Sequence, residues 1–345
     1  MKKKGQSIRT IIIASFALLA FLAASDTTEA KVYQWKWYSP YNLAVSPTMD
    51  KLPPLIEKKT DGQIKVTLYV GGQHPFQGPD MPRALKTGAC QMGDVLGAYC
   101  AGIDPRLGAT DMPFFSNNPE EEEALMTTVL KDVYDKFFND YNMMPLASYP
   151  FPGQAILANV LVKNMDSLKG KKIRVFNKTS ADMIATMGGT PVTIPFAEVY
   201  TALQRGVVDG AVGSTFGQVM AKNVEVAKLL TRTHAYGQGN SWFVMVSKSA
   251  FNELPADLQE KLREAAVEYQ ELARKRQHEI DAMAVKDASD KYGCTVASVG
   301  PAFRQQIRER MKEGCWVKWA KTFPGGMELL AEMEAFHENW VKTHK

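Results

Sequence analysis

Short stretches of alternating apolar and polar residues recur along the first half of the chain, and residues with helical spacing separate them. Met81, Leu85 and Ala89 fall on one face of a helix. Pro53 and Pro54 lie inside the first helical stretch, and proline disfavours the middle of a helix. The pattern predicts strands at 32–37, 64–70 and 91–96 and helices at 46–59 and 81–89. This alternation predicts an α/β sheet, in which ligands bind outside the carboxyl ends of the strands.

A second pattern of the same kind begins after Phe151-Pro-Gly-Gln154, where prolines and a glycine interrupt regular structure. Gly188-Gly189 and Gly206 follow predicted helices, as expected for left-handed helix caps. The pattern predicts strands at 155–162, 172–176, 191–194, 207–212 and 240–246 and helices at 180–187 and 197–205. The restart after an interruption indicates a second α/β unit.

A long helical pattern runs from Pro255 to about Tyr292 without Pro or Gly. A pattern of more than about 25 residues is unusual inside a compact domain. Apolar residues such as Leu258, Leu262 and Leu272 form a stripe, but heptads are not sustained. We therefore expect a helix that lies across two domains, with a coiled coil as the alternative. A terminal helix is predicted at 326–340.

The first 30 residues have the three-part layout of a secretory signal peptide. Lys2–Lys4 and Arg9 are basic, residues 11–24 are apolar, and Thr28-Glu29-Ala30 offers small residues for cleavage before Lys31. The apolar stretch is shorter than the roughly 20 residues of a membrane-spanning helix. We expect export and cleavage, with an uncleaved anchor as the alternative.

Length and charge narrow the class of protein. The 345 residues exceed the roughly 250–300 residues that one core supports, so two domains are expected. Residues 1–30 hold four Lys/Arg and two Asp/Glu, so the formal charge of +4 falls to about +2 in the exported part. That charge is too small to indicate binding to nucleic acid or to an anionic membrane.

Four cysteines lie in the exported part: Cys90, Cys100, Cys294 and Cys315. An even number in an oxidising compartment favours disulfides, and Cys90–Cys100 and Cys294–Cys315 are the pairs closest in sequence. Four cysteines permit three connectivities. No C-x-x-C motif is present and no His adjoins these residues, which disfavours a metal site. Buried free thiols are the alternative.

Enzyme signatures are absent from the sequence. It has no nucleophile elbow, no phosphate-binding loop and no H-E-x-x-H motif. The histidines are scattered, and we expect His337 and His344 to be exposed. Glu120–Glu123 follow Asn118-Pro119 and fit the first turn of a helix, where carboxylates favour the helix dipole. The sequence therefore predicts neither catalysis nor a metal or cofactor site.

Arg174 is the residue that calls for a functional explanation. Alternation in 172–176 places Arg174 and Lys172 on one face of a strand and Ile173 and Val175 on the other. An Arg on a strand of an α/β sheet is partly desolvated and needs an anionic partner. Its planar guanidinium matches a carboxylate, which belongs to a ligand or to a protein residue such as Asp209.

The segment around Arg174 resembles the DctP-type substrate-binding proteins of TRAP transporters. Three runs carry the resemblance: Lys169-Gly-Lys-Lys-Ile-Arg174, Gly188-Gly-Thr-Pro-Val192 and Glu198-Val-Tyr-Thr-Ala-Leu-Gln-Arg-Gly-Val-Val-Asp-Gly210. Asp61-Gly62 through Gly71-Gly-Gln73 and Leu254-Pro255 before the long helix are similar too. The resemblance covers essentially the whole chain after residue 30.

The resemblance implies an α/β fold of the two-domain, type II-like periplasmic-binding-protein kind. Crossing strands join the domains, and the long helix at about 255–292 spans both. The implied domain I comprises 31–150 and 239–278, and domain II comprises 151–238 and 279–345. A cleft between them closes on a small organic acid, which is delivered to the TRAP permease subunits in the membrane. Arg174 occupies the position of the family's carboxylate-binding arginine.

Departures from the family pattern narrow the ligand. Gln154 stands where sialic-acid-type members have a second arginine, and Gly213 and Val212 replace an asparagine and an acidic residue of that subfamily. A sugar acid of that kind is therefore disfavoured. Oxo-acid binders that hold a metal use a Gln at this place and an acid after Asp-Gly. The acid is missing here, so no metal is expected.

Aromatic and small polar residues complete the predicted pocket. Phe196 matches a ligand-facing aromatic of the family, and the others lie in cleft-forming segments or near strand ends. The predicted ligand-binding residues are Arg174, Gln154, Phe196, Ser214, Thr215, Phe216, Phe151, Phe176, Gln73, Tyr38 and Tyr99. Together they indicate a ligand with one acid group and an apolar or planar remainder, such as an aromatic monocarboxylate or a sulfonate.

Two further functions compete with transport. A receptor of the same fold presents its ligand to a membrane sensor kinase, and an adjacent kinase gene would favour that function. Permease genes next door would favour transport. A periplasmic lyase or hydrolase is the third alternative, but the sequence offers no nucleophile–base pair for it.

Overall fold

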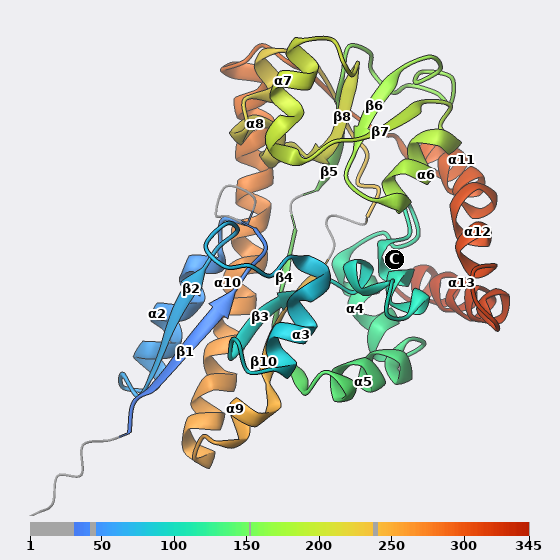
Figure 1. The fold of residues 1–345 in the computed structure, drawn as a ribbon. Coiled ribbons are helices and arrows are strands. Elements are labelled where there is room, and N and C mark those ends of the chain that lie inside the picture. The colour runs from blue at the N-terminus through green and yellow to red at the C-terminus, as the bar shows by residue number, and fades with distance from the viewer. Residues whose placement is uncertain (1–30, 42–45, 152, 237–240, 345) are drawn as a thin grey trace, which may run out of the picture. The chain divides into compact units, whose positions relative to one another are not determined.

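Two β-sheets organise the chain in the computed structural model, which describes residues 31–41, 46–151, 153–236 and 241–344 (Figure 1). The predicted signal peptide, residues 1–30, lies outside the described residues. Apart from Tyr33 at the start of the first strand, the features below lie in the unit Gln34–Lys345. Among the described residues, no helix has both the length and the hydropathy that crossing a bilayer requires.

The first sheet has the strand order β2-β1-β3-β10-β4. Its strands are β1 (Tyr33–Tyr38), β2 (Ile64–Tyr69), β3 (Met92–Val95), β4 (Met143–Pro150) and β10 (Ser241–Ser247). Residues alternate along β1, where Trp35 and Trp37 are buried and Lys36 is exposed. The sequence pattern did not predict β4, which contains Pro145. A proline is tolerated there because β4 is an edge strand with a register shift opposite Val244 and Met245.

The second sheet has the order β11-β9-β5-β8-β6-β7. Its strands are β5 (Gln154–Ala158), β6 (Lys172–Val175), β7 (Thr190–Thr193), β8 (Gly210–Ser214), β9 (Leu229–Arg232) and β11 (Thr295–Ser298). Strand β6 pairs in parallel with β7 on one side and with β8 on the other. Ile173, Arg174 and Val175 are all buried. Arg174 therefore lies in the interior of a sheet and not at its exposed edge.

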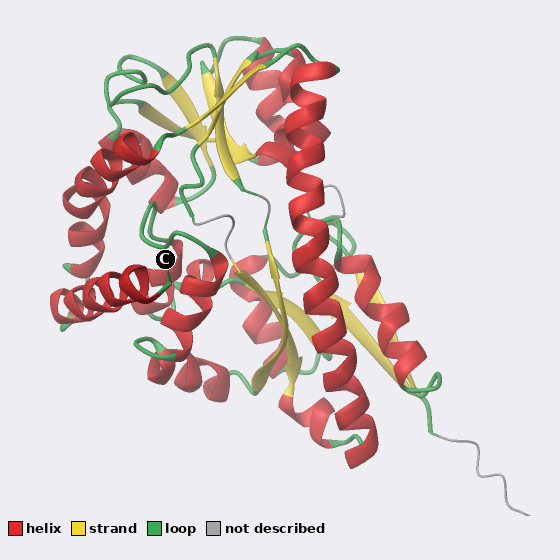
Figure 2. Cartoon of the chain, turned by 180° about the vertical axis from the view of Figure 1, so that it is seen from behind, coloured by secondary structure: helices red, strands yellow, loops and turns green. Residues whose placement is uncertain are grey.

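Helices cover both sheets (Figures 1 and 2). They are α2 (Leu52–Lys59), α3 (Met81–Lys86), α4 (Pro119–Thr127), α5 (Lys131–Asp140), α6 (Lys178–Thr186), α7 (Val199–Gln204), α8 (Thr215–Met220), α9 (Lys248–Asn252), α10 (Ala256–Asp290), α11 (Pro301–Met311), α12 (Val317–Ala320) and α13 (Gly326–Thr343). Pro53 and Pro54 lie in the first turn of α2 and not in its middle. Backbone N–H groups have no helical partner in the first turn, so proline is tolerated there.

The long helix α10 contacts elements of both sheets, which confirms the predicted spanning helix (Figure 2). It packs against helix α2 and strand β4 on the side of the first sheet. On the side of the second sheet it packs against helix α8 and strand β11. Leu258, Leu262 and Tyr269 are buried along it, as the apolar stripe predicted. Leu272 is the exception, because 41% of its surface is exposed.

The chain passes between the sheets three times, the third time along α10 from β10 to β11. It leaves the first sheet after β4, enters the second at β5, and returns between β9 and β10. A two-domain α/β fold with crossing segments and a spanning helix is therefore present. The residue boundaries of the two domains stay a prediction.

The expected disulfides are not formed. All four cysteines are free, and all are buried. Cys294 packs in one apolar cluster with Leu230, whereas Cys315 packs in another with Met311. Separate clusters keep Cys294 and Cys315 from the close approach that a disulfide needs. Cys90 and Cys100 share a cluster as separate thiols, and burial raises the pKa of each to about 12.

The C-terminal helices correct a second expectation. His337 on α13 is buried and not exposed, and its Nδ1 contacts the buried carboxylate of Glu121. Glu121 lies in the first turn of α4, as predicted for this acidic run, and its Oε2 accepts from Asn117 N at 2.7 Å. The pairing joins α13 to α4. The polar sequence around His337 therefore did not predict its burial, because α13 packs against the buried Glu121.

Candidate functional site

A pocket of about 700 Å³ lies where the carboxyl ends of strands from both sheets meet. Its lining residues lie within or beside strands of both sheets. They are Pro40, Tyr41, Gly71, Gly72, Phe76, Gln77, Leu96, Tyr99, Asp111, Phe151, Gln154, Arg174, Phe176, Thr193, Ile194, Pro195, Phe196, Ala197, Gly213, Ser214 and Gly217. This is the edge at which open α/β sheets bind ligands, as expected.

Arg174 supplies the positive charge of the pocket. Its side chain is held by two backbone carbonyls: Nε donates to Ile194 O at 2.8 Å and Nη1 to Val212 O at 2.9 Å. Val212 lies in β8 and Ile194 directly follows β7, so segments on both sides of β6 orient the guanidinium. Arg174 lines the pocket although only 4% of its surface is exposed.

Among the described residues, Arg174 forms no ion pair. Asp209, the protein carboxylate that the sequence offered as its partner, accepts instead from Lys172 N at 2.8 Å and from Asn159 Nδ2 at 3.1 Å. Burial lowers the pKa of Arg174 to about 10, so the group remains protonated at neutral pH. A buried cation without a carboxylate partner is costly, and an anion that enters the pocket relieves that cost.

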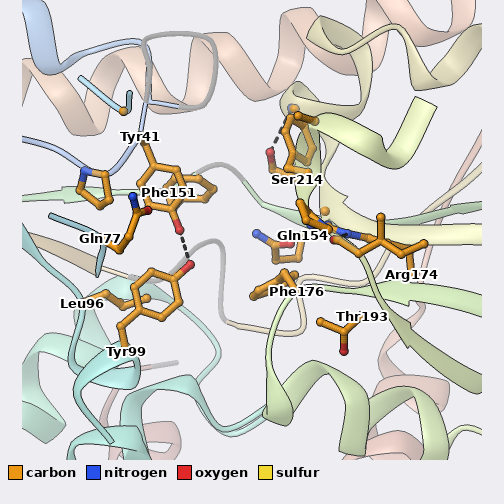
Figure 3. A pocket seen from close by; sticks show the side chains of 18 of the residues that line it. Tyr41, Gln77, Leu96, Tyr99, Phe151, Gln154, Arg174, Phe176, Thr193 and Ser214 are labelled. Atoms are coloured by element: carbon orange, nitrogen blue, oxygen red, sulfur yellow. Dashed lines mark hydrogen bonds between the residues drawn. The ribbon is translucent and has the colours of Figure 1, made fainter. Parts of the chain in front are cut away.

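Aromatic rings flank the guanidinium and extend across the pocket (Figure 3). Cζ of Arg174 lies 5.9 Å from the ring centre of Phe176 and 5.7 Å from that of Phe196. Tyr41 and Tyr99 face Arg174 from the opposite side of the view, with their hydroxyl oxygens in contact. Burial raises the pKa of both tyrosines, so both are neutral at physiological pH.

Gln154 lies at the start of β5, directly opposite Ser214 of β8. Its backbone carbonyl accepts from the backbone N–H groups of Thr233 and His234, each at 3.0 Å. Its side-chain Oε1 is buried and has no hydrogen-bond partner among the described residues. The Ser214 hydroxyl accepts from Gly217 N at 3.0 Å and caps α8. The pocket thus contains one fixed cation and one buried amide acceptor.

Asp111 is the acidic side chain in the described lining. Its Oδ2 accepts from Asn177 Nδ2 and from Thr179 Oγ1, both at 2.7 Å. Asn177 also caps α6, so Asp111 is linked to the helix that follows β6. The buried carboxyl group of Asp111 thus accepts hydrogen bonds from two residues of the second sheet's α6 region.

Gly213 is required by close packing beside the site. A Cβ at this position would lie 2.8 Å from Nε2 of Gln218, which donates to Ala211 O at 3.2 Å. The Gln218 side chain thus fills the space that a residue larger than glycine would need. This explains why Gly213 contributes backbone alone to the pocket wall.

Seven of the eleven residues predicted as ligand-binding line the pocket: Arg174, Gln154, Phe196, Ser214, Phe151, Phe176 and Tyr99. The other four are not in its described lining. Tyr38 stacks on His74, and Gln73 Oε1 accepts from Val70 N. Thr215 is fully buried, and Phe216 packs on the apolar cluster around Leu230.

Several lining residues were missed in the sequence. Tyr41 is three residues beyond the end of β1, and Asp111 ends a short helical turn at Pro105–Asp111. Gln77 and Phe76 follow the Gly71-Gly72 turn after β2. The rule that ligands lie beyond strand ends points to Tyr41 and Phe76, but no local signal points to Asp111.

Among the described residues, no group of three or more His, Cys, Asp or Glu side chains is arranged to hold a metal ion. The arrangement suits recognition of a small anion: a fixed guanidinium, aromatic walls and few polar groups.

The sequence model of the DctP family, described as bacterial extracellular solute-binding protein, family 7, matches residues 40–321. The C4-dicarboxylate-binding periplasmic protein DctP of Rhodobacter capsulatus is 30% identical over 249 residues, which are 69% of this chain and 72% of that protein.

Solved structures share the fold. A TRAP periplasmic solute binding protein from Ochrobactrum anthropi, with its C-terminus bound in the ligand binding pocket, has a TM-score of 0.77 and 26% identity. The match covers 92% of this chain and 99% of that one. DctP6, a Bordetella pertussis extracytoplasmic solute receptor binding pyroglutamic acid, has a TM-score of 0.76 and 23% identity, with 88% and 99% covered.

Proposed function

Because the chain belongs to the DctP family of bacterial extracellular solute-binding proteins, we propose that it is the periplasmic receptor of a TRAP-type transporter. It binds a small organic acid in the pocket between the sheets and hands it to the membrane permease. The predicted signal peptide and the periplasmic name of the Rhodobacter relative support the location. Its function is binding and release, with no chemical step.

One observation carries the proposal. Arg174 is buried, is held by two carbonyls, and forms no ion pair among the described residues, yet it lines the pocket. Nε and Nη1 are engaged with the protein, which leaves Nη2 as the main donor to an incoming carboxylate. A carboxylate at this place completes a charge-assisted pair with a guanidinium that is largely buried.

The ligand carries one acid group. Among the described lining residues, Arg174 is the only Lys or Arg, so a second carboxylate would have no cation with which to pair. The stretches 42–45, 152 and 237–240 contain no charged residue in the sequence. The site therefore favours a monocarboxylate over a C4-dicarboxylate.

Binding is coupled to closure of the pocket. The aromatic residues come from both sheets, so a ligand between them gains contacts with both walls only when the walls approach each other. The bridging ligand favours the closed form because it binds that form more tightly.

A thermal-shift screen of organic acids, beginning with pyroglutamate and succinate, tests the proposal. At 100 times its Kd, a bound acid stabilises the native state by about 2.7 kcal/mol, so the wild type melts at a higher temperature. Arg174→Ala should abolish this increase while its circular dichroism spectrum stays native. Arg205→Ala removes an exposed arginine at the end of α7 and should keep the increase.

Two outcomes contradict the proposal. One is an Arg174→Ala variant that is stabilised as strongly as the wild type. The other is stronger stabilisation by succinate than by every monocarboxylate in the panel.

A further inference from the structure

Gln154 places an unsatisfied acceptor beside the proposed anion site. Gln154 and Arg174 lie on the two strands next to β8. Gln154 pairs with Ser214 of β8, and Arg174 Nη1 donates to the carbonyl of Val212, two residues before Ser214. Figure 3 shows Gln154 between Arg174 and the Tyr41–Tyr99 pair. Oε1 of Gln154 has no hydrogen-bond donor among the described residues, and only 5% of the residue surface is exposed.

The protein holds this acceptor in place. The Gln154 backbone is fixed by its pairing with β8 and by the two N–H groups that its carbonyl accepts. Its closest strand partner, Ser214, uses its hydroxyl oxygen to accept from Gly217 N. A buried acceptor without a donor carries a desolvation cost, which a ligand that brings an N–H or O–H removes.

The shape beside Arg174 is suited to a flat ring. The Phe176 and Phe196 rings lie within 6 Å of the guanidinium, and Tyr41, Tyr99, Phe151 and Phe76 continue the aromatic lining. A ring attached directly to the carboxyl group lies between these side chains once its carboxylate meets Arg174. Stacking between aromatic faces favours such a planar body.

We infer that the pocket selects a cyclic monocarboxylate whose ring carries an N–H next to the carboxyl-bearing carbon. The carboxylate binds Arg174, the ring lies between the aromatic walls, and the neighbouring N–H donates to Gln154 Oε1. The inference rests on the proposed function and specifies the class of acid that this same site takes.

Pyrrole-2-carboxylate and furan-2-carboxylate form a matched pair of probes. They share ring size, planarity and charge, and differ by an N–H in one and a ring oxygen in the other. The furan oxygen brings a second acceptor against Gln154 Oε1. Isothermal titration calorimetry on the wild-type protein should show pyrrole-2-carboxylate binding about tenfold or more tightly.

Variants at Gln154 assign the preference to this residue. Gln154→Met keeps the length of the side chain without the amide, and the two probes should then bind within about threefold of each other. Gln154→Glu keeps acceptor oxygens, so the preference for pyrrole-2-carboxylate should survive while both affinities fall through charge repulsion. Gln204→Met changes an exposed glutamine outside the described pocket lining and should keep the wild-type ratio.

The results separate this inference from the proposed function. Equal affinities in the wild type, or a preference for furan-2-carboxylate, overturn the inference because Gln154 is then not an acceptor toward the ligand. The inference also fails if neither probe binds while another acid shows Arg174-dependent stabilisation. If no acid shows Arg174-dependent stabilisation, the proposed function itself fails. The wild-type comparison decides the inference even if a Gln154 variant does not fold.

Discussion

The position of Arg174 in the interior strand β6 fixes the orientation of its charged side chain. Carbonyls of Val212 in β8 and of Ile194 directly after β7 accept from its guanidinium, so the orientation of the charge is fixed before a ligand arrives. Such preorganisation reduces the conformational entropy that binding must overcome. Its pKa, lowered by burial to about 10, still leaves the cation intact across the physiological range.

Asp94 is another buried ionisable residue, and it lies in the first sheet away from the pocket lining. Its oxygens accept from Trp37 Nε1 at 2.9 Å and from Tyr149 OH at 3.1 Å. Burial raises the pKa of Asp94 to about 7. The folded protein therefore binds a proton at Asp94 more tightly than the unfolded chain does, and this stabilising effect is lost as pH rises toward 7.

Asp94→Asn should remove that pH dependence. Between pH 5 and pH 8 the wild type should lose on the order of 2 kcal/mol of unfolding free energy relative to the variant, because only the wild type must ionise a buried carboxyl. Urea unfolding at both pH values measures the difference. Asp132→Asn, at an exposed position, serves as the control, and a parallel pH response of wild type and Asp94→Asn would contradict the prediction.

At the scale of elements, α10 shows how periodicity and burial diverge. A helix of 35 residues touches two sheets in succession, so different parts of its circumference face the protein along its length. The residue Leu262 is fully buried, whereas Leu272 is 41% exposed, although the sequence assigned both to one stripe. Helical spacing defines a face, but the neighbouring elements decide which part of it is covered.

The two leucines provide a matched test on one helix. Leu262→Ala should lower the unfolding free energy by about 2–5 kcal/mol, since it leaves a cavity in a packed core. Leu272→Ala removes the same atoms from an exposed position and should change it by no more than about 0.5 kcal/mol. Denaturant unfolding of both variants gives the comparison, and equal losses would mean that α10 packs in another orientation.

At the scale of the whole molecule, the pocket and the cysteines both depend on how distant segments meet. Residues from Pro40 to Gly217 converge on one pocket because the carboxyl ends of strands in two sheets converge there. The cysteines are distributed over separate apolar clusters, where each is a buried thiol. Burial raises the pKa of the Cys315 thiol to about 11, so it is protonated and unreactive at neutral pH.

The thiol state is directly measurable. Titration with Ellman's reagent in denaturant without reductant should count four thiols in the mature protein, and the native protein should react slowly. Reducing agent should leave the thermal unfolding temperature unchanged. A count below four in freshly purified protein would show that a disulfide forms.

The sequence by itself determined the features that are local. Alternation identified the strand of Arg174, uninterrupted helical spacing identified α10, and the runs around Arg174 identified the family because they are contiguous. These inferences succeed because a repeat of two or 3.6 residues is visible within one element.

Only the tertiary structure decided which side chains meet. Tyr41 and Asp111 line the pocket, whereas Tyr38 and Gln73 are not in its described lining. The Arg174 guanidinium donates hydrogen bonds to backbone carbonyls. The Asp209 carboxylate accepts from Lys172 N and does not pair with Arg174. His337 is buried because α13 docks on Glu121, and Cys294 and Cys315 lie in separate clusters. Each of these outcomes depends on packing between segments distant in the sequence, and a local pattern of residues contains no information on those distances.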